Sequence, residues 1–210
     1  MRRILTAATP VALILITFLA LVACATTSTR ITESWANPEV KAPLAFDKVF
    51  VLLVGKDHDM RVQVEGAIAA RLQRAGLTGV PANMSVLDKD LKDQARVKDQ
   101  LSQIHVDGVI VIRYLGTSER TQYVSTSSSY WGAYPEFWGY YNWAWPTVWD
   151  PGYYVTDTFV KVETRIYDLR TGKLIWGGMS QTMNPRDAQA AANELAQTVG
   201  AALRKDGLIK

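Results

Sequence analysis

The run Val49-Phe-Val-Leu-Leu-Val54 is apolar without interruption and ends at Gly55, and a second run of this kind, Val109-Ile-Val-Ile112, follows Asp107-Gly108. Short continuous runs rich in Val and Ile are typical of strands that are covered on both faces. Such strands are usually parallel and are joined by a long crossover, most often a helix. The two runs therefore predict the parallel centre of an α/β sheet.

The chain between the two runs supplies the crossovers. Apolar residues recur at helical spacing over residues 57–75 and 86–104, and Gly76 is a suitable end for the first helix. Residues 78–81 predict a short strand at a sheet edge, because Pro81 has no N–H group to donate to a neighbouring strand. The resulting order, β-α-β-α-β, favours parallel pairing with right-handed connections.

The second half of the chain predicts an antiparallel meander. Residues 158–167 alternate between an apolar and a largely polar face, and residues 119–126 alternate more weakly. Turn residues at 168–173 lead into a hairpin partner at 174–183, and a final helix ends near Gly207. The predicted fold is an α/β domain whose mixed sheet has a parallel β-α-β-α-β core, followed by an antiparallel meander and a C-terminal helix.

The amino terminus has the three parts of a secretory signal. Arg2 and Arg3 precede the apolar run 11–23, which is shorter than the ~20 apolar residues that a membrane span requires. The run ends in Leu-Val-Ala-Cys24, which resembles the lipobox of bacterial lipoproteins. That resemblance implies cleavage before Cys24, acylation (palmitate) of this only cysteine and, because Ala25 follows, sorting to the outer membrane of a proteobacterium.

A linker is predicted between the acylated cysteine and the domain. Residues 26–43 are rich in Thr and Ser and contain two prolines, so we expect an extended tether that holds the domain away from the bilayer. The expected location is the periplasmic face of the outer membrane, with the inner membrane or the cell surface as alternatives. The expected organisation is a signal peptide at 1–23, a lipidated tether at 24–45 and a single α/β domain at 46–210, with an aromatic-rich insertion at 130–154.

The most unusual stretch is the segment 130–154, YWGAYPEFWGYYNWAWPTVWDPGYY, in which twelve of 25 residues are aromatic and only Glu136 and Asp150 are charged. Its prolines and glycines argue against a long regular helix or strand. Long insertions between strands are more often functional or disordered than structural. The candidate binding residues are Trp131, Trp138, Tyr140, Tyr141, Trp143, Trp145 and Trp149.

Three interpretations of this segment are open. In the first, it folds back over a bare face of the sheet as a local core, because aromatic side chains bury large areas. In the second, it binds an envelope protein or another copy of this chain, because Trp and Tyr dominate interface hot spots. In the third, it contacts lipid headgroups or stacks on sugar rings of the cell envelope, because Trp and Tyr favour interfaces.

Charge and motifs argue against nucleic-acid binding and against catalysis. Without Arg2 and Arg3 the chain has 21 basic and 20 acidic residues, so no broad basic surface is expected. One cysteine excludes an intramolecular disulfide. The chain has no phosphate-binding loop, no dinucleotide fingerprint and no nucleophile elbow. We therefore expect no cofactor, no metal and no catalytic residue.

Asp57-His58-Asp59 is the one segment whose residue types could form a small metal or proton-transfer site. It follows the first buried strand, at the end of the sheet where open α/β folds bind ligands. Capping of the next helix is the favoured role for these carboxylates. A metal-dependent enzyme that uses the three residues is the least favoured function, because no third ligand is identifiable and one histidine makes a weak site.

The stretch Tyr167-Asp-Leu-Arg-Thr-Gly-Lys-Leu-Ile-Trp-Gly177, followed by an alanine-rich helix, resembles bacterial lipoproteins with the domain of unknown function 4136. The strand-helix-strand half is similar in outline to the amino-terminal domain of the translocation protein TolB. These resemblances imply a non-catalytic domain that binds other envelope proteins. The expected function is a membrane-anchored periplasmic lipoprotein that presents its aromatic loop to another envelope component or to itself. The alternative is a glycan or small-ligand binding module.

Overall fold

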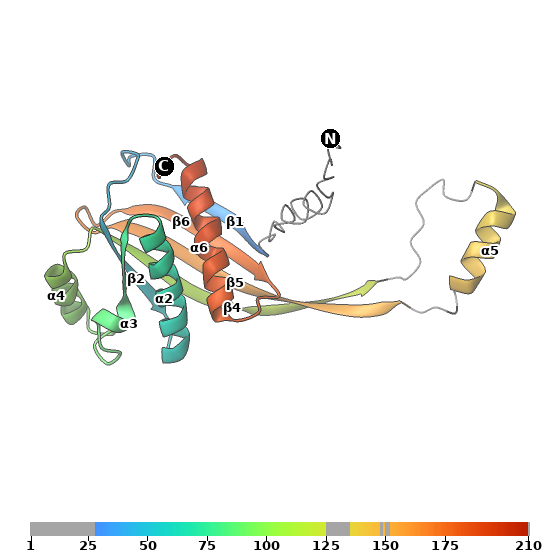
Figure 1. Cartoon of the computed structure of the whole chain (residues 1–210), viewed down its shortest axis with the longest axis horizontal. Helices are drawn as coiled ribbons and strands as arrows, with labels where there is room; N and C mark the ends of the chain where they lie inside the picture. The colour runs from blue at the N-terminus through green and yellow to red at the C-terminus, as the bar shows by residue number, and fades with distance from the viewer. Residues whose placement is uncertain (1–27, 125–134, 148, 150–151, 210) are drawn as a thin grey trace, which may run out of the picture.

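The computed structural model describes residues 28–124, 135–147, 149 and 152–209, which contain one six-stranded sheet in the order β1-β6-β5-β4-β2-β3 (Figure 1). The strands are β1 Thr29–Ala36, β2 Lys48–Val54, β3 Thr78–Pro81, β4 Gly108–Val124, β5 Tyr153–Asp168 and β6 Leu174–Met183. The helices in this part of the chain are α2 His58–Arg74, α3 Ala82–Ser85, α4 Gln94–Ile104, α5 Phe137–Thr147 and α6 Ala188–Lys205.

The strand pairing confirms the predicted fold class. β2 is parallel to both β3 and β4, whereas the β4–β5, β5–β6 and β1–β6 pairs are antiparallel. The two apolar runs lie side by side in the parallel centre, with Phe50 opposite Val109 and Leu53 opposite Ile112. The sheet is therefore mixed, and the C-terminal helix α6 closes the chain as predicted.

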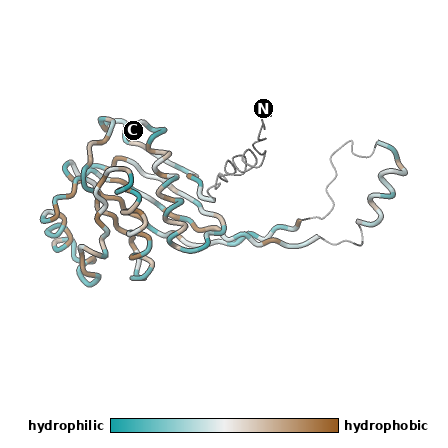
Figure 2. Tube along the Cα trace, in the orientation of Figure 1, coloured by the Kyte–Doolittle hydropathy of each residue, from teal (hydrophilic) through white to brown (hydrophobic). Residues whose placement is uncertain are grey.

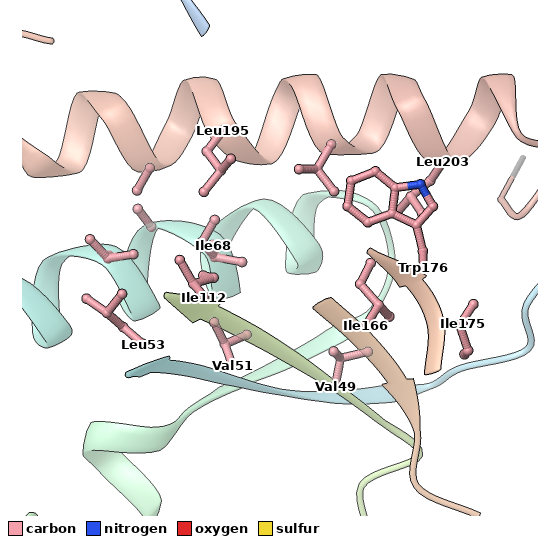
Figure 3. Close-up of a cluster of buried hydrophobic side chains, with 14 of the residues drawn as sticks. Val49, Val51, Leu53, Ile68, Ile112, Ile166, Ile175, Trp176, Leu195 and Leu203 are labelled. Atoms are coloured by element: carbon pink, nitrogen blue, oxygen red, sulfur yellow. The ribbon is translucent and has the colours of Figure 1, made fainter. Parts of the chain in front are cut away.

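Two cores account for the continuous apolar runs. The main core lies between one face of the sheet and helices α2 and α6, and Val51, Leu53 and Ile112 point into it (Figure 3). On the opposite face, α3 and α4 cover Phe50 and Val109 in a smaller core. The central strand β2 is thus buried on both faces, which is why its sequence does not alternate.

Trp176 of β6 is the largest fully buried side chain among the described residues, and the two glycines that follow it differ in how closely they approach its ring. Its Nε1 donates a hydrogen bond of 3.0 Å to Oδ2 of Asp206, at the end of α6. A Cβ atom on Gly178 would lie 2.2 Å from the Trp176 ring, whereas a Cβ atom on Gly177 would meet no atom within 4 Å. Packing of the indole ring therefore requires glycine at 178 and not at 177.

The segment that sequence analysis places in the tether contributes a strand to the sheet. Residues 29–36 form β1, which pairs along the outer edge of β6. The buried Thr29 hydroxyl lies 2.8 Å from the Thr182 hydroxyl and donates to Glu194 of α6 at 3.0 Å. Thr is common both in linkers and in strands, because its β-branched side chain suits a half-buried pleated surface. Residues 29–36, which the sequence analysis places in the tether, are therefore part of the sheet.

The predicted helix over 86–104 is shorter than its periodicity suggests. Helix α4 begins only at Gln94, because the Asp93 carboxylate accepts hydrogen bonds from two backbone N–H groups of the first turn. Residues 86–93 form turns instead and bring Asp88 to α2, where it accepts a hydrogen bond from Arg61.

The two adjacent glycines offer a matched test of the packing around Trp176. We expect Gly178→Ala to lower the free energy of unfolding by about 1–3 kcal/mol, because the rigid, buried indole has to move. We expect Gly177→Ala to change it by less than about 0.5 kcal/mol. Urea unfolding of both variants checks this, and equal losses in the two variants would contradict the assignment.

Candidate binding arm

Strands β4 and β5 continue beyond the sheet as a two-stranded ribbon. The β2–β4 ladder ends at Arg113 and the β5–β6 ladder ends at Phe159, whereas β4 and β5 remain paired out to Val124 and Tyr153. The sequence analysis predicts separate strands at 109–112 and 119–126, and the structure joins them in β4. The ribbon and helix α5 project away from the domain (Figure 1), and we refer to residues 117–124, 153–159 and α5 as the arm.

Two residues shape the root of the arm. The β4–β5 register shifts between Tyr114 and Gly116, and this bulge coincides with a φ of 135° at Gly116, a conformation that favours glycine. On the other side, Asn184 follows the end of β6 with a φ of 47°. Its N–H donates to the Thr158 carbonyl and its Oδ1 accepts from the Thr158 N–H, each at 2.7 Å. Asn184 thus extends the ladder by one residue where β6 stops.

The ribbon itself is largely polar, with β4 exposed along its length and β5 exposed or half-buried. The hydroxyls of the cross-strand pair Thr121 and Thr156 lie 2.9 Å apart, and Gln122 donates to Asp157 at 3.0 Å. Cross-strand pairs of this kind each contribute roughly 0.2–1 kcal/mol to the stability of a sheet. The ribbon therefore has no apolar face of its own to bury.

Aromatic residues begin at the outer end of the ribbon. The rings of Tyr123 and Tyr154 meet edge to face with centroids 5.3 Å apart. The Gly152 N–H donates to the Tyr123 hydroxyl at 2.8 Å, and a Cβ atom on Gly152 would lie 2.2 Å from the Val124 carbonyl oxygen. This close approach requires glycine and holds the chain against the end of the ladder.

Helix α5 occupies part of the segment for which sequence analysis expects no long regular helix. It has 11 residues, and Pro146 is its penultimate residue. Pro135 lies before its first turn. Pro135 therefore disturbs no hydrogen bond of the helix, whereas Pro146 removes the bond that its missing N–H would donate to the Asn142 carbonyl and so weakens the last turn. Among the helices of the described residues, none is both long and apolar enough to cross a bilayer.

The rings of α5 pack on one another along the helix. The Phe137 centroid lies 4.9 Å from that of Trp138 and 5.9 Å from that of Tyr141, and Tyr141 stacks on Trp145 at 6.0 Å. Spacings of one, three and four residues bring these four rings together on one side of the helix. A second pair, Tyr140 with Trp143, has a centroid distance of 5.6 Å.

Most of the predicted binding residues are presented to solvent. The exposed fractions are 69% for Trp138, 61% for Trp145 and 80% for Trp149. Tyr140 and Tyr141 are also exposed, Trp143 is half-buried, and Trp131 lies outside the described residues. Those rings that the structure describes lie on the arm and not on the sheet, so they do not cover a bare sheet face. The interpretations as a protein-binding or an envelope-binding surface remain open.

The chemistry of α5 is that of an interface. It contains no Asp, Glu, Lys or Arg. Figure 2 shows brown, hydrophobic stretches in the strands and helices of the domain, whereas most of α5 is coloured white to teal. Trp and Tyr have this intermediate hydropathy because each combines a large apolar ring with one polar N–H or O–H group. Such side chains are favoured where one end is apolar and the other is wet.

Asp57-His58-Asp59 has the structural role that the sequence favours for it. The Asp57 carboxylate caps α2 and accepts from the Met60 N–H at 3.0 Å. His58 Nδ1 lies 2.8 Å from Asp88 Oδ2, so the histidine is part of an exposed pair. Within the described ranges, no three His, Cys, Asp or Glu residues are grouped so as to hold a metal ion.

A buried charged pair next to this segment escapes sequence analysis. Glu65 is fully buried and accepts from the Leu53 N–H at 2.9 Å, from two Asn83 nitrogens at 2.7 Å and from Arg61 Nε at 3.3 Å. Arg61 is also buried and donates to Asp88. Glu65 therefore ties α2 to the end of β2 and to α3. The only sequence signal is a charged pair at i,i+4 on the buried face of a helix.

Comparisons with known proteins leave the family open. No protein-family model matches the chain, and no curated protein matches it. Among solved structures, it is similar to a PelC dodecamer from Paraburkholderia phytofirmans, with 13% identity, coverage of 87% of this chain and 99% of that chain, and a TM-score of 0.44. It is also similar to lipoprotein GNA1162 from Neisseria meningitidis, with 19% identity, coverage of 76% and 99%, and a TM-score of 0.38. These comparisons do not confirm the resemblance to the domain of unknown function 4136 or to TolB.

The position of Asp88 predicts a loss of stability in acid. Hydrogen bonds from His58 and Arg61 hold the pKa of the Asp88 carboxyl below its ordinary value of 3.8. The stabilisation is complete above that ordinary value and is lost as the pH falls through the lowered folded-state pKa. Urea unfolding between pH 6 and pH 2.5 should show a shallower acid decline in Asp88→Asn than in the unaltered protein. Identical slopes would mean that Asp88 does not contribute.

Proposed function

We propose that this protein is a non-catalytic, lipid-anchored protein of the bacterial cell envelope that uses its arm to engage a second envelope component. The observation that carries the proposal is an uncharged aromatic helix on a polar two-stranded ribbon, outside both cores of the domain. Rings exposed by half or more on one short helix form a patch of the kind that marks a binding surface.

The construction of the arm supports a binding role. A two-stranded ribbon without a hydrophobic face is at best marginally stable in water, so the arm adds little to the stability of the domain. The glycines at the bulge and at the tip are required by the arm's own geometry and not by the core. Because the arm does not stabilise the domain, we attribute its presence to a contact with another molecule.

The anchor is proposed from the sequence. Cys24 lies outside the described residues, as do the signal peptide at 1–23 and Ala25. Their pattern supports acylation of Cys24 and location on the periplasmic face of the outer membrane. A glycan is the second candidate for the engaged component, because the exposed indoles of Trp138 and Trp149 offer flat faces on which sugar rings stack.

A photo-crosslinking residue in place of Trp145 tests the proposal in living cells. Trp145 is 61% exposed on α5, and Lys92, which is exposed on the domain far from the arm in sequence, is the control position. We expect a discrete crosslinked product, to a protein or to lipid, from position 145 and not from position 92. The same products from both positions, or none from either, would contradict a binding role for the arm.

Excision of the arm separates binding from folding. Thr117 and Val160 lie opposite each other in the β4–β5 ladder, so residues 118–159 can be replaced by Asn-Gly, a sequence suited to a tight hairpin. We expect this variant to keep its secondary structure and to unfold cooperatively within a few degrees of the unaltered protein, because neither core loses a residue. Collapse of the fold, measured by circular dichroism and thermal unfolding, would show that the arm is structural.

A further inference from the structure

The anchor and the arm leave the domain at the same end of the sheet. β1 starts with Thr29 opposite Thr182, and the Met183 N–H donates to the Ser28 carbonyl at 3.2 Å. Met183 in turn pairs with Phe159, where the free ribbon begins. The chain therefore enters the fold two strands away from the root of the arm, a separation of about 10 Å at ordinary strand spacing.

The chain between the proposed anchor and this end of the sheet is short. Only four residue steps separate Cys24 from Ser28, which span at most about 14 Å when fully extended. Ser28 is held to the domain, because Glu194 of α6 accepts hydrogen bonds from its N–H at 3.0 Å and from its hydroxyl at 2.8 Å. Residues of β1 could extend this chain only by breaking those hydrogen bonds. The domain is thus held against the bilayer and not suspended above it.

The arm is longer than the chain from Cys24 to Ser28. From Phe159 to Tyr153 the ribbon extends over six residue steps, or about 20 Å. Helix α5 lies beyond, and its last residue is six steps from Tyr153 along the chain. When this end of the sheet faces the bilayer, the distance from the sheet to the bilayer is at most the length of the chain from Cys24 to Ser28. The ribbon is longer than that distance, so its tip meets the bilayer surface.

The tip has the chemistry of a bilayer interface and not of a membrane span. An 11-residue helix is about 16 Å long, roughly half of the hydrocarbon core. Trp and Tyr concentrate at the headgroup level, where the ring is buried and its N–H or O–H remains hydrated. The ribbon carries Arg120, Gln122 and Asp157, which belong in water. The boundary between polar ribbon and aromatic tip therefore matches the boundary between water and headgroups.

We infer that α5 lies in the headgroup interface of the same bilayer that holds Cys24, so that the protein is attached at two points. This rests on the proposed function and names the component that the arm engages. Several acyl chains already anchor a protein stably, so the second contact fixes the orientation of the domain and is not needed to retain it. Because α5 has no charged side chain, the contact does not depend on anionic lipids.

The test uses the mature chain from residue 24 with Cys24→Ser, which carries no acyl chain and removes none of the described residues. We expect it to bind vesicles of pure phosphatidylcholine, to shift its tryptophan emission to the blue, and to keep both properties between 0.05 and 0.5 M salt. We expect Trp138→Ala/Trp145→Ala to lower the partition coefficient by about tenfold or more. Trp35→Ala, which removes an exposed indole on β1, is the matched control and should bind normally.

Each other outcome overturns the inference in a distinct way. Binding only to anionic vesicles, weakened by salt, would place the contact on basic residues of the domain. A protein crosslinked to position 145 without vesicle binding would refute the lipid contact and leave the proposed function intact. A fluorescence response to muropeptides but not to vesicles would assign the arm to glycans. No response to either, together with no crosslink at position 145, would refute both proposals.

Discussion

The long hydrogen-bonded ladder between β4 and β5, with its single bulge between Tyr114 and Gly116, is the constraint on which the rest of the molecule depends. It runs from Gly108 opposite Asp168, inside the domain, to Val124 opposite Tyr153 at the tip. Its inner half is fixed because β2 flanks it on one side and β6 on the other, with helices packed over both faces of β4. Its outer half has no flanking strand, so its register is inherited from the core. The place of the aromatic tip follows from packing some twenty ångströms or more away.

The elements that sequence predicts well are those whose pattern has one physical explanation. The continuous runs in β2 and the first part of β4 are correct, because only burial on both faces makes an uninterrupted apolar strand stable. β1 could not be predicted, since its Thr and Ser residues suit a linker as well as an edge strand. The continuity of β4 through Gly116 was equally hidden, because a bulge interrupts the alternation on which strand prediction relies.

The sequence identifies the residues of the candidate site but not where the fold places them. The aromatic density of 130–154 singles out the residues, yet composition alone does not separate a local core from an exposed surface, because both are rich in Trp and Tyr. What decides between them is the length of the ribbon, which depends on unflanked backbone pairing. Arg61 and Glu65 illustrate the opposite case: charged residues are rarely buried, so sequence assigns them to solvent, whereas a full set of hydrogen bonds stabilises Glu65 inside the fold.

The chain length between the two strands of the arm also sets the order of folding. Val124 and Tyr153 face each other across the ladder but are separated by 28 residues, so no tight turn closes the ribbon at its tip. Closing a loop of that length costs entropy that the few polar contacts of the outer ribbon do not offset. We therefore expect the ladder to form first inside the domain, where core packing stabilises it, and then to extend outward. We expect the aromatic tip to be the last part to form and the first to open, so that protection of backbone amides from exchange with water decreases along the ribbon from Ser118 to Val124.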